Sequence, residues 1–389
     1  MFGVAEGAVL PVVALTARGL GASVAAAALV VALIGVGSLV SNIPSAIITT
    51  RYGERTAIMA AGGVSAGALL IAMVAPDVAV LAGAMLLVGF ANAVFSLARL
   101  SYLTEAVPVA MRARALSTLG GSARIGVFIG PFLGAAAIHL FGIHAAYAVG
   151  ALAAAIAGLI AVFSRDLIAN AEQDGPDHSG ITLRMVLGSH GRVFGTLGIG
   201  VILISAVRAS RQVVIPLWAE HLNLSPTATS LIYGLAGALD MAVFYPAGKV
   251  MDRRGRRWVA VPSMVLMGTA LMLVPLTGGF TRLLLVSMVL GFGNGIGSGM
   301  VATMGADLAP TNGRPVFLGV WRLLGDTGGC SGPVLLSVIT GAAGLAAGVI
   351  ANGGLGLLAA AIVWYWIPRT SRPEQQPLAI PDDRAAEPS

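Results

Sequence analysis

The sequence predicts an all-α integral membrane protein built from twelve transmembrane helices in two related halves. Of its 389 residues, 57% are hydrophobic and only 10% are charged, which is too few charges to cover a soluble globule of this size. Apolar segments close to the roughly 20 residues that span a bilayer recur twelve times. The two halves also match at a constant offset of 202 residues, so that Pro44 matches Pro246 and Asn92 matches Asn294.

The first half contains six apolar segments separated by short turns. Its first segment is short, and Glu6 is the only charge within it. The predicted helices are 1–17, 24–48, 56–75, 78–104, 115–140 and 145–163. A polar stretch with several acidic and basic residues follows, and its composition indicates a connection rather than a helix of the bilayer. We assign 1–164 to an N-terminal six-helix bundle and 165–192 to a cytoplasmic linker.

The second half has the same layout. Its predicted helices are 193–219, 225–250, 258–277, 282–306, 316–340 and 343–367. We assign 193–367 to a C-terminal six-helix bundle. The tail, 368–389, is rich in proline and has no apolar run, so it is expected to be disordered and cytoplasmic.

The repeat predicts that the first helix is truncated. The seventh helix begins at Val193, whose partner in the first half would lie about nine residues before Met1. Either the protein starts upstream of Met1, which we favour, or its first helix is unusually short. A helix that short would thin the bilayer or tilt its neighbours.

Basic residues predict the orientation. In the turns, linker and tail, sixteen arginines and lysines fall on one side of the membrane, and only Arg18 and Arg282 fall on the other. Because basic residues are retained in the cytoplasm, both termini are expected there, in the inner (plasma) membrane of the cell. The same rule accounts for the net charge of +6, and nucleic acid is not expected as a partner.

The most specific motif lies in the loop 248–257, which holds the only lysine and five cations in ten residues. Its pattern, G-x-x-x-D-R-x-G-R-R, resembles the signature loop of the major facilitator superfamily. The resemblance implies two six-helix bundles around a central cavity and a loop that latches the cytoplasmic side during transport. The implied latch residues are Gly248, Asp252, Arg253, Gly255 and Arg256.

The first-half copy of this loop is incomplete. It keeps Arg51, Gly53 and Arg55, but it has Thr50 in place of the aspartate and Glu54 in place of a basic residue. Only the second copy is therefore expected to carry the charge of the latch.

A second pattern, E-x-x-P-x-x-x-R, occurs at Glu105, Pro108 and Arg112 and recurs at Asp307, Pro310 and Arg314. It is similar to the ends of helices four and ten in the same superfamily. That resemblance implies gating pairs between Glu105 and Arg51 and between Asp307 and Arg253. The alternative is ordinary capping at the membrane interface with weak exposed ion pairs.

A third pattern places Gly126, Gly130, Pro131 and Gly134 in the fifth helix. It resembles a motif typical of bacterial drug/proton antiporters of the superfamily, although Ser117 stands where that motif has a further glycine. The alternative is close helix packing through small residues, which a degenerate copy at Gly328, Gly332 and Pro333 favours. The arginine of the family's fourth helix would fall at Met85, so a proton relay through it is not carried over.

Ionisable residues inside predicted helices are functional candidates, because burying a charge in a membrane requires a partner or a wet cavity. We expect Glu6 to face Arg208 or Arg211 across the cavity and to bind and release a proton during transport. The alternative is a static bridge that holds the halves in register. Asp240 is the second candidate for proton coupling.

Further candidates for lining the substrate cavity share a polar side chain at helical depth. They are Asn92, Arg99, Arg124, Gln212, Asn294, Arg322 and Asp326, with Trp218 as a cavity or interface residue. Arg322 and Asp326 lie four residues apart and could instead neutralise each other. No metal or cofactor is expected, because the histidines have no metal-like pairing and Cys330 is the only cysteine.

The sequence thus predicts a transporter and not an enzyme. It contains no ATP-binding P-loop and no pattern of an intramembrane protease. The resemblance favours alternating access with proton-coupled export of a small amphipathic molecule by a monomer in the lipid bilayer. The alternatives are metabolite uptake or facilitated export by the same fold, and a non-transporting membrane scaffold.

Overall fold

The computed structural model describes residues 1–107, 109–163, 183–310 and 314–367. Most of the predicted linker and the whole predicted tail lie outside these residues. The described chain is helical throughout, and eleven of its helices are long and apolar enough to cross a membrane. The predicted fold class, an all-α membrane protein, is confirmed.

Six helices form the first bundle. They are α1 Phe2–Gly19, α2 Val24–Tyr52, α3 Glu54–Met73, α4 Val78–Ala106, α5 Val109–Phe141 and α6 Ala145–Val162. The side chains of Ser23 and Asp77 cap α2 and α4 by accepting from the amides of Ala26 and Val80, which supplies partners for otherwise unpaired donors at the helix starts. α1 and α6, with 18 residues each, are the shortest helices of this bundle.

The second bundle contains more breaks. Its elements are α7 Leu183–Val193, the π-helix η2 Phe194–Gly198, α8 Ile199–His221, α9 Pro226–Arg254, α10 Arg257–Leu273, the 3₁₀ helix η3 Val274–Leu276, α11 Phe280–Ile296, α12 Met300–Leu308, α13 Arg314–Ala343 and α14 Leu345–Trp366. The end of the predicted linker is therefore helical, since α7 leads through η2 into α8. α13 has 30 residues, more than the 22 of α14, and it carries Arg322 and Asp326 near its middle.

Helix ends follow the offset of the sequence repeat. α2 and α9 begin at 24 and 226 and end at 52 and 254, and α5 and α13 end at 141 and 343. The turns correspond as well, because Gly53 and Gly255 both have a left-handed backbone, with φ 81° and 93°. Glycine adopts this conformation at no steric cost.

One helix departs from the repeat. The span predicted over 282–306 is broken, because α11 ends at Ile296 and α12 starts after Gly299, whose φ is 78°. The equivalent α4 is continuous. The three glycines of the run 295–299 permit the break, which leaves backbone carbonyls without their helical partners at membrane depth.

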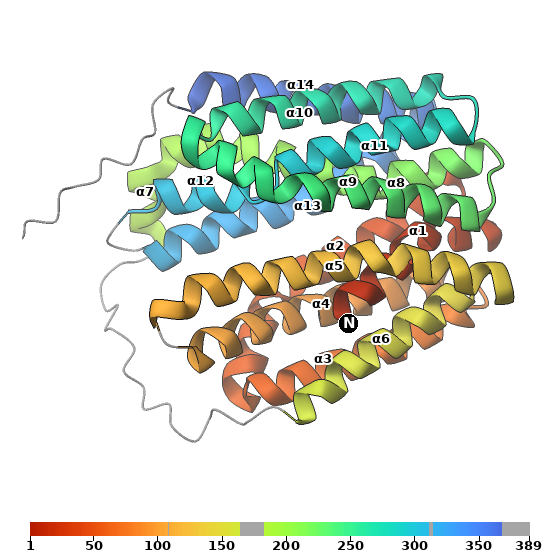
Figure 1. Ribbon diagram of the computed structural model, residues 1–389, viewed down its shortest axis with the longest axis horizontal. Coiled ribbons are helices and arrows are strands. Elements are labelled where there is room, and N and C mark those ends of the chain that lie inside the picture. Colours follow the sequence, from red (N-terminus) through yellow and green to blue (C-terminus); the bar gives the residue numbers. More distant parts are fainter. Residues whose placement is uncertain (108, 164–182, 311–313, 368–389) are drawn as a thin grey trace, which may run out of the picture.

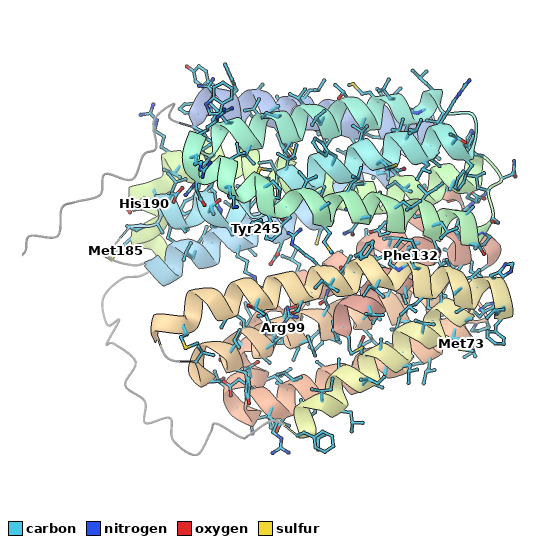
Figure 2. All side chains as sticks on the ribbon, viewed as in Figure 1. Met73, Arg99, Phe132, Met185, His190 and Tyr245 are labelled. Atoms are coloured by element: carbon cyan, nitrogen blue, oxygen red, sulfur yellow. The ribbon has the colours of Figure 1, made fainter. Side chains whose placement is uncertain are left out.

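The helices form two bundles that meet mainly along α2 with α13 and α5 with α9, and α1 also contacts α8 and α9 (Figure 1). We call the end at which α6 ends and α7 begins the linker end, and the end at which α1 and α8 finish the opposite end. The bundles diverge toward the linker end. Phe132 lies where they meet (Figure 2), and a Cβ on Gly234 of α9 would lie 3.0 Å from its ring.

Glycines of α5 bring it against the backbone of α1. A Cβ on Gly126 would lie 2.9 Å from the Val4 amide nitrogen, and one on Gly134 would lie 3.1 Å from the Ala8 carbonyl oxygen. Gly328 and Gly332 of α13 lie in the same way against α8. Because both copies of the glycine pattern bring a helix pair together, close packing accounts for the pattern in each half.

Candidate functional site

Two cavities lie between the bundles, near the middle of the helices. The larger, about 350 Å³, is lined by residues of α1, α2, α4, α8 and α13. The second, about 240 Å³, is lined by residues of α1, α5, α8, α9 and α11. Glu6 and Gln212 line both, so we treat the two as one central chamber. Its size is in the range of small-molecule sites.

Asp240 of α9 is the centre of a charged cluster in this chamber. Its Oδ1 lies 3.5 Å from Nη1 of Arg124, and its Oδ2 lies 3.6 Å from Nη2 of Arg211. The side-chain amide of Asn294 donates to the same carboxylate. Four helices, α5, α8, α9 and α11, thus meet at one side chain that is only 16% exposed.

The break between α11 and α12 takes part in this cluster. Arg208 of α8 donates from Nε to Oδ1 of Asn294 at 2.7 Å, and from Nη1 to the carbonyl of Gly297 at 3.3 Å. Arg124 donates to the hydroxyl of Ser298. The guanidinium groups thus satisfy acceptors that the broken helix exposes, which is how irregular backbone is tolerated at membrane depth.

Arg211 keeps an unsatisfied donor. The residue is 8% exposed and lines the second cavity, and its Nε has no hydrogen-bond partner in the structure. Buried donors are normally paired because leaving one unpaired costs free energy. The Nε atom is itself covered, so an acceptor that enters the chamber could pair with it only after the Arg211 side chain moves.

Glu6 and Arg211 line the same cavity, as expected, but no ion pair between them is seen among the described residues. Arg211 instead pairs with Asp240, and Arg208 donates to Asn294. The guanidinium of Arg99 of α4 lies 5.6 Å from the centre of the Phe95 ring. Arg208 does not line either cavity, because α8 turns it toward α11, and Arg211 reaches Asp240 of α9.

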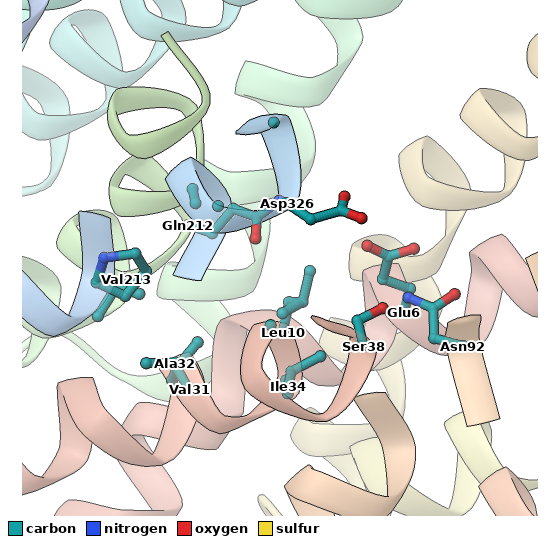
Figure 3. A pocket seen from close by; sticks show the side chains of 15 residues that line it. Glu6, Leu10, Val31, Ala32, Ile34, Ser38, Asn92, Gln212, Val213 and Asp326 are labelled. Atoms are coloured by element: carbon teal, nitrogen blue, oxygen red, sulfur yellow. The ribbon is translucent and has the colours of Figure 1, made fainter. Parts of the chain in front are cut away.

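Asp326 of α13 lies on the other side of the chamber. Its carboxylate accepts from Nδ2 of Asn42 at 2.9 Å and lies 3.8 Å from Nε of Arg322. Figure 3 shows the carboxylates of Asp326 and Glu6 directed into the same cavity. Arg322 is half exposed and, like Arg99, is not among the residues lining the two cavities, whereas Asn92 lines the larger one.

The loop between α9 and α10 holds a well-formed ion pair. Nε and Nη2 of Arg256 donate to the two oxygens of Asp307 at 2.8 and 3.3 Å. This hydrogen bonding raises the pKa of Arg256, so the guanidinium stays charged. The expected partner of Asp307 was Arg253, which is exposed instead. The left-handed Gly255 explains the difference, because it turns the chain so that Arg256 faces α12.

The remaining latch residues are more open. Asp252 is 76% exposed and contacts Arg256 of its own bundle at 3.5 Å. Arg51 is exposed, with its guanidinium 5.6 Å from the ring of Tyr52. The side chains of Glu105, Arg112 and Arg314 lie outside the described part of the structure, so the pair expected between Glu105 and Arg51 stays a prediction.

An ion pair joins the bundles at the opposite end. Nε of Arg18, on the last turn of α1, lies 3.1 Å from Oε1 of Glu220 on the last turn of α8. The two residues are 202 apart, so the repeat relates them to each other. Nearby, the hydroxyl of Ser337 donates to the carbonyl of Ala25 at 2.7 Å. We call the Arg18–Glu220 pair the clasp.

Sequence reasoning missed Asn42 and Phe244, which the repeat relates to each other. Phe244 lies against Arg124, with 4.4 Å from the guanidinium to the ring centroid, and Asn42 binds Asp326. The repeat likewise relates Arg124 to Asp326. The repeat alone gave no signal for Asn42 or Phe244, because neither is charged, and only their contacts with Asp326 and Arg124 identify them.

Comparison with known proteins identifies the chain's relatives. The family model of the Major Facilitator Superfamily matches residues 1–194 and 197–387. A comparison with curated proteins finds no match.

Solved structures with the same fold are transporters of several substrates. A bacterial homolog of the human lysosomal transporter Spinster, in an inward-facing, unoccupied conformation, superposes with a TM-score of 0.78 at 13% identity, covering 94% of this chain and 93% of the other. The nucleoside transporter NupG gives 0.73 at 14%, covering 94% and 97%. A D-xylose–proton symporter gives 0.69 at 16%, covering 95% and 96%.

Proposed function

The chain belongs to the major facilitator superfamily, and we propose that it is a proton-coupled exporter of small amphipathic molecules that works by alternating access. The central chamber, with titratable groups at the depth where the bundles meet, is the observation that carries the proposal. Secondary transporters bind substrate and coupling ions near the midplane, between their repeats.

The walls of the chamber support an amphipathic substrate. Leu10, Val31, Ile34 and Val213 contribute apolar surface to the larger cavity, and Gln212 contributes an amide to both cavities. Sites of this kind bind an apolar body and orient it through a few polar groups.

The contacts at the two ends support a state open toward the linker end. The clasp and the hydrogen bond from Ser337 to Ala25 close the opposite end, whereas the bundles diverge at the linker end (Figure 1). Asp252 is exposed there, as a released latch would leave it. The linker end carries most of the basic residues, which are retained in the cytoplasm. This state is therefore open toward the cytoplasm.

Breaking the clasp is expected to shift the protein toward its outward-open state. Arg18 and Glu220 are each about one-third exposed, and such pairs contribute up to about 1 kcal/mol, or about fivefold in a conformational equilibrium. Glu220→Gln should therefore increase the labelling of a cysteine introduced in the chamber by a reagent added from outside, on a Cys330→Ser background. Reversing both charges together, Arg18→Glu with Glu220→Arg, should restore the original labelling. Equal labelling in all variants would contradict a closing role.

Glu6→Gln is expected to abolish proton coupling while preserving substrate exchange. A neutral amide at this position can still hydrogen-bond, but it cannot take up and release a proton as the chamber changes sides. In proteoliposomes with an imposed pH gradient, substrate-linked proton flux should disappear, while exchange of labelled for unlabelled substrate continues.

The same assay separates the alternatives. Proton flux that persists in Glu6→Gln would leave Glu6 as a static element of the bundle. A protein that shows neither proton flux nor substrate exchange in its unaltered form would be a membrane scaffold, and the proposed export would be wrong.

A further inference from the structure

Resting on the proposed function, we propose that the transported molecule is a small zwitterion, bound with its anionic group at Arg124 and Arg211 and its cationic group between Glu6 and Asp326. The proposal is based on the charges that the two halves place at repeat-related positions in and around the chamber. Glu6 and Arg208 occupy equivalent positions with opposite charges, and so do Asp326 and Arg124.

The basic side of the chamber has an excess of cations. Arg124 and Arg211 lie beside the carboxylate of Asp240, and Arg208 binds Asn294 next to it. With Glu6, which lines the same cavity, two carboxylates face three guanidinium groups, and burying a charge without compensation in a membrane protein is costly. Arg211 adds a buried Nε without a partner. A carboxylate or phosphate entering the second cavity would supply the missing negative charge, in the way that arginine forks recognise planar anions.

The acidic side lies in the adjoining cavity. Glu6 and Asp326 both line it and direct their carboxylates into it (Figure 3). Two carboxylates that face one cavity repel each other, and a cation placed between them relieves that repulsion. Asp326 accepts a hydrogen bond from Asn42 and lies 3.8 Å from Nε of Arg322. That ion pair is long and half exposed, so it compensates the carboxylate only weakly.

A singly charged molecule fits this chamber less well than a dipolar one. A simple anion is attracted to the arginine side and repelled by Glu6 and Asp326. A simple cation is attracted to these two carboxylates and repelled by the arginines. A molecule with both charges matches both sides at once, and its apolar body lies against Leu10 and Val213. Amino acids with apolar side chains have this chemistry.

Matched compounds test the proposal on the full-length protein. One set is phenylalanine, phenylpropanoate and phenylethylammonium, and the other is leucine, methylpentanoate and methylbutylammonium. Thermal stabilisation of the purified protein gives the affinity of each compound, and proteoliposomes report proton flux. At least one of the two zwitterions should bind, about tenfold or more tightly than the members of its set that carry one charge.

The variants should separate the two ends of the ligand. Arg211→Gln should weaken binding of the zwitterion and of the carboxylate about tenfold or more, and it should leave binding of the ammonium compound unchanged. Asp326→Asn should weaken binding of the zwitterion and of the ammonium compound, and it should leave binding of the carboxylate compound unchanged. Arg282→Gln is the matched control, because this arginine is exposed at the start of α11, and it should change no affinity.

Several outcomes would overturn the proposal. It is wrong if neither zwitterion binds, if a singly charged compound binds as tightly as its zwitterion, or if Arg211→Gln and Asp326→Asn weaken all compounds equally. Proton flux driven by a singly charged compound would contradict a zwitterionic substrate but would still support proton-coupled export. Tight binding of a zwitterion without any proton flux would instead support the ligand class and contradict proton coupling.

Discussion

Asp240→Asn is expected to abolish transport and to destabilise the protein by about 3–5 kcal/mol, the usual cost of removing one partner of a buried ion pair. The carboxylate is 16% exposed and lies between Arg124 and Arg211, and it also accepts from the amide of Asn294. Its loss leaves the guanidinium groups of α5 and α8 facing one another without a counter-charge. Thermal unfolding in detergent, followed by tryptophan fluorescence, measures the stability, and the proteoliposome assay measures transport.

Two further variants make this result specific. Asp252→Asn removes the same charge from a side chain that is 76% exposed, and it should change stability by no more than about 0.5 kcal/mol. Combining Asp240→Asn with Arg211→Gln removes one uncompensated cation and should recover part of the lost stability. A single Asp240→Asn variant with unchanged stability and flux would contradict the central place of this carboxylate.

Gly130→Val is expected to separate α1 from α5 and to prevent recovery of folded protein. A Cβ on Gly130 would lie 2.6 Å from the carbonyl oxygen of Val4 and 2.7 Å from the amide nitrogen of Ala8. Both atoms belong to backbone within α1, so neither can move without moving the helix. Overpacking commonly costs about 1–3 kcal/mol and more where nothing can yield, and we expect the upper end here. Size-exclusion profiles and thermal unfolding measure the effect.

Gly121→Val is the matched control on the same helix. No atom lies within 4 Å of a Cβ at Gly121, so the variant makes the same chemical change, with the same effect on helix propensity, but without a collision. It should stay monodisperse and nearly as stable as the unaltered protein. Equal damage from the two substitutions would mean that valine harms α5 for a reason other than contact with α1.

Both the clasp and the charged residues of the chamber lie at positions that the repeat relates to each other. The clasp joins two repeat-related residues, Arg18 and Glu220, near the axis that relates the bundles. The chamber charges are also repeat-related, but with opposite signs in the two halves. Duplication thus supplied equivalent places for side chains, and substitution in one half made the chamber dipolar.

Much of the architecture follows from the sequence. Hydropathy predicts the spans, because the thickness of the bilayer sets the length of an apolar helix, and the repeat predicts which helices correspond. α2 and α9 begin and end at repeat-related residues. The break at Gly297–Gly299 could not be predicted in this way, because glycine is also common in continuous membrane helices and the equivalent α4 is unbroken.

The partners of the charged residues were harder to predict. Glu6 lines one cavity with Arg211, as expected, but Arg211 forms its ion pair with Asp240, and Asp307 binds Arg256 in place of Arg253. A side chain's partner depends on the rotation of its helix about its own axis and on the course of the adjacent turn. Neither is contained in the order of hydrophobic and polar residues when a helix is apolar on all sides.

The sequence by itself determined that this chain spans the membrane as two related helical halves with ionisable residues at depth, because both the apolar lengths and the offset are properties of the order of residues. Only the tertiary structure decided that Asp240 gathers Arg124, Arg211 and Asn294, and that Glu6 and Asp326 share one cavity. These groups come from different helices, and contact between them exists only once the helices have packed.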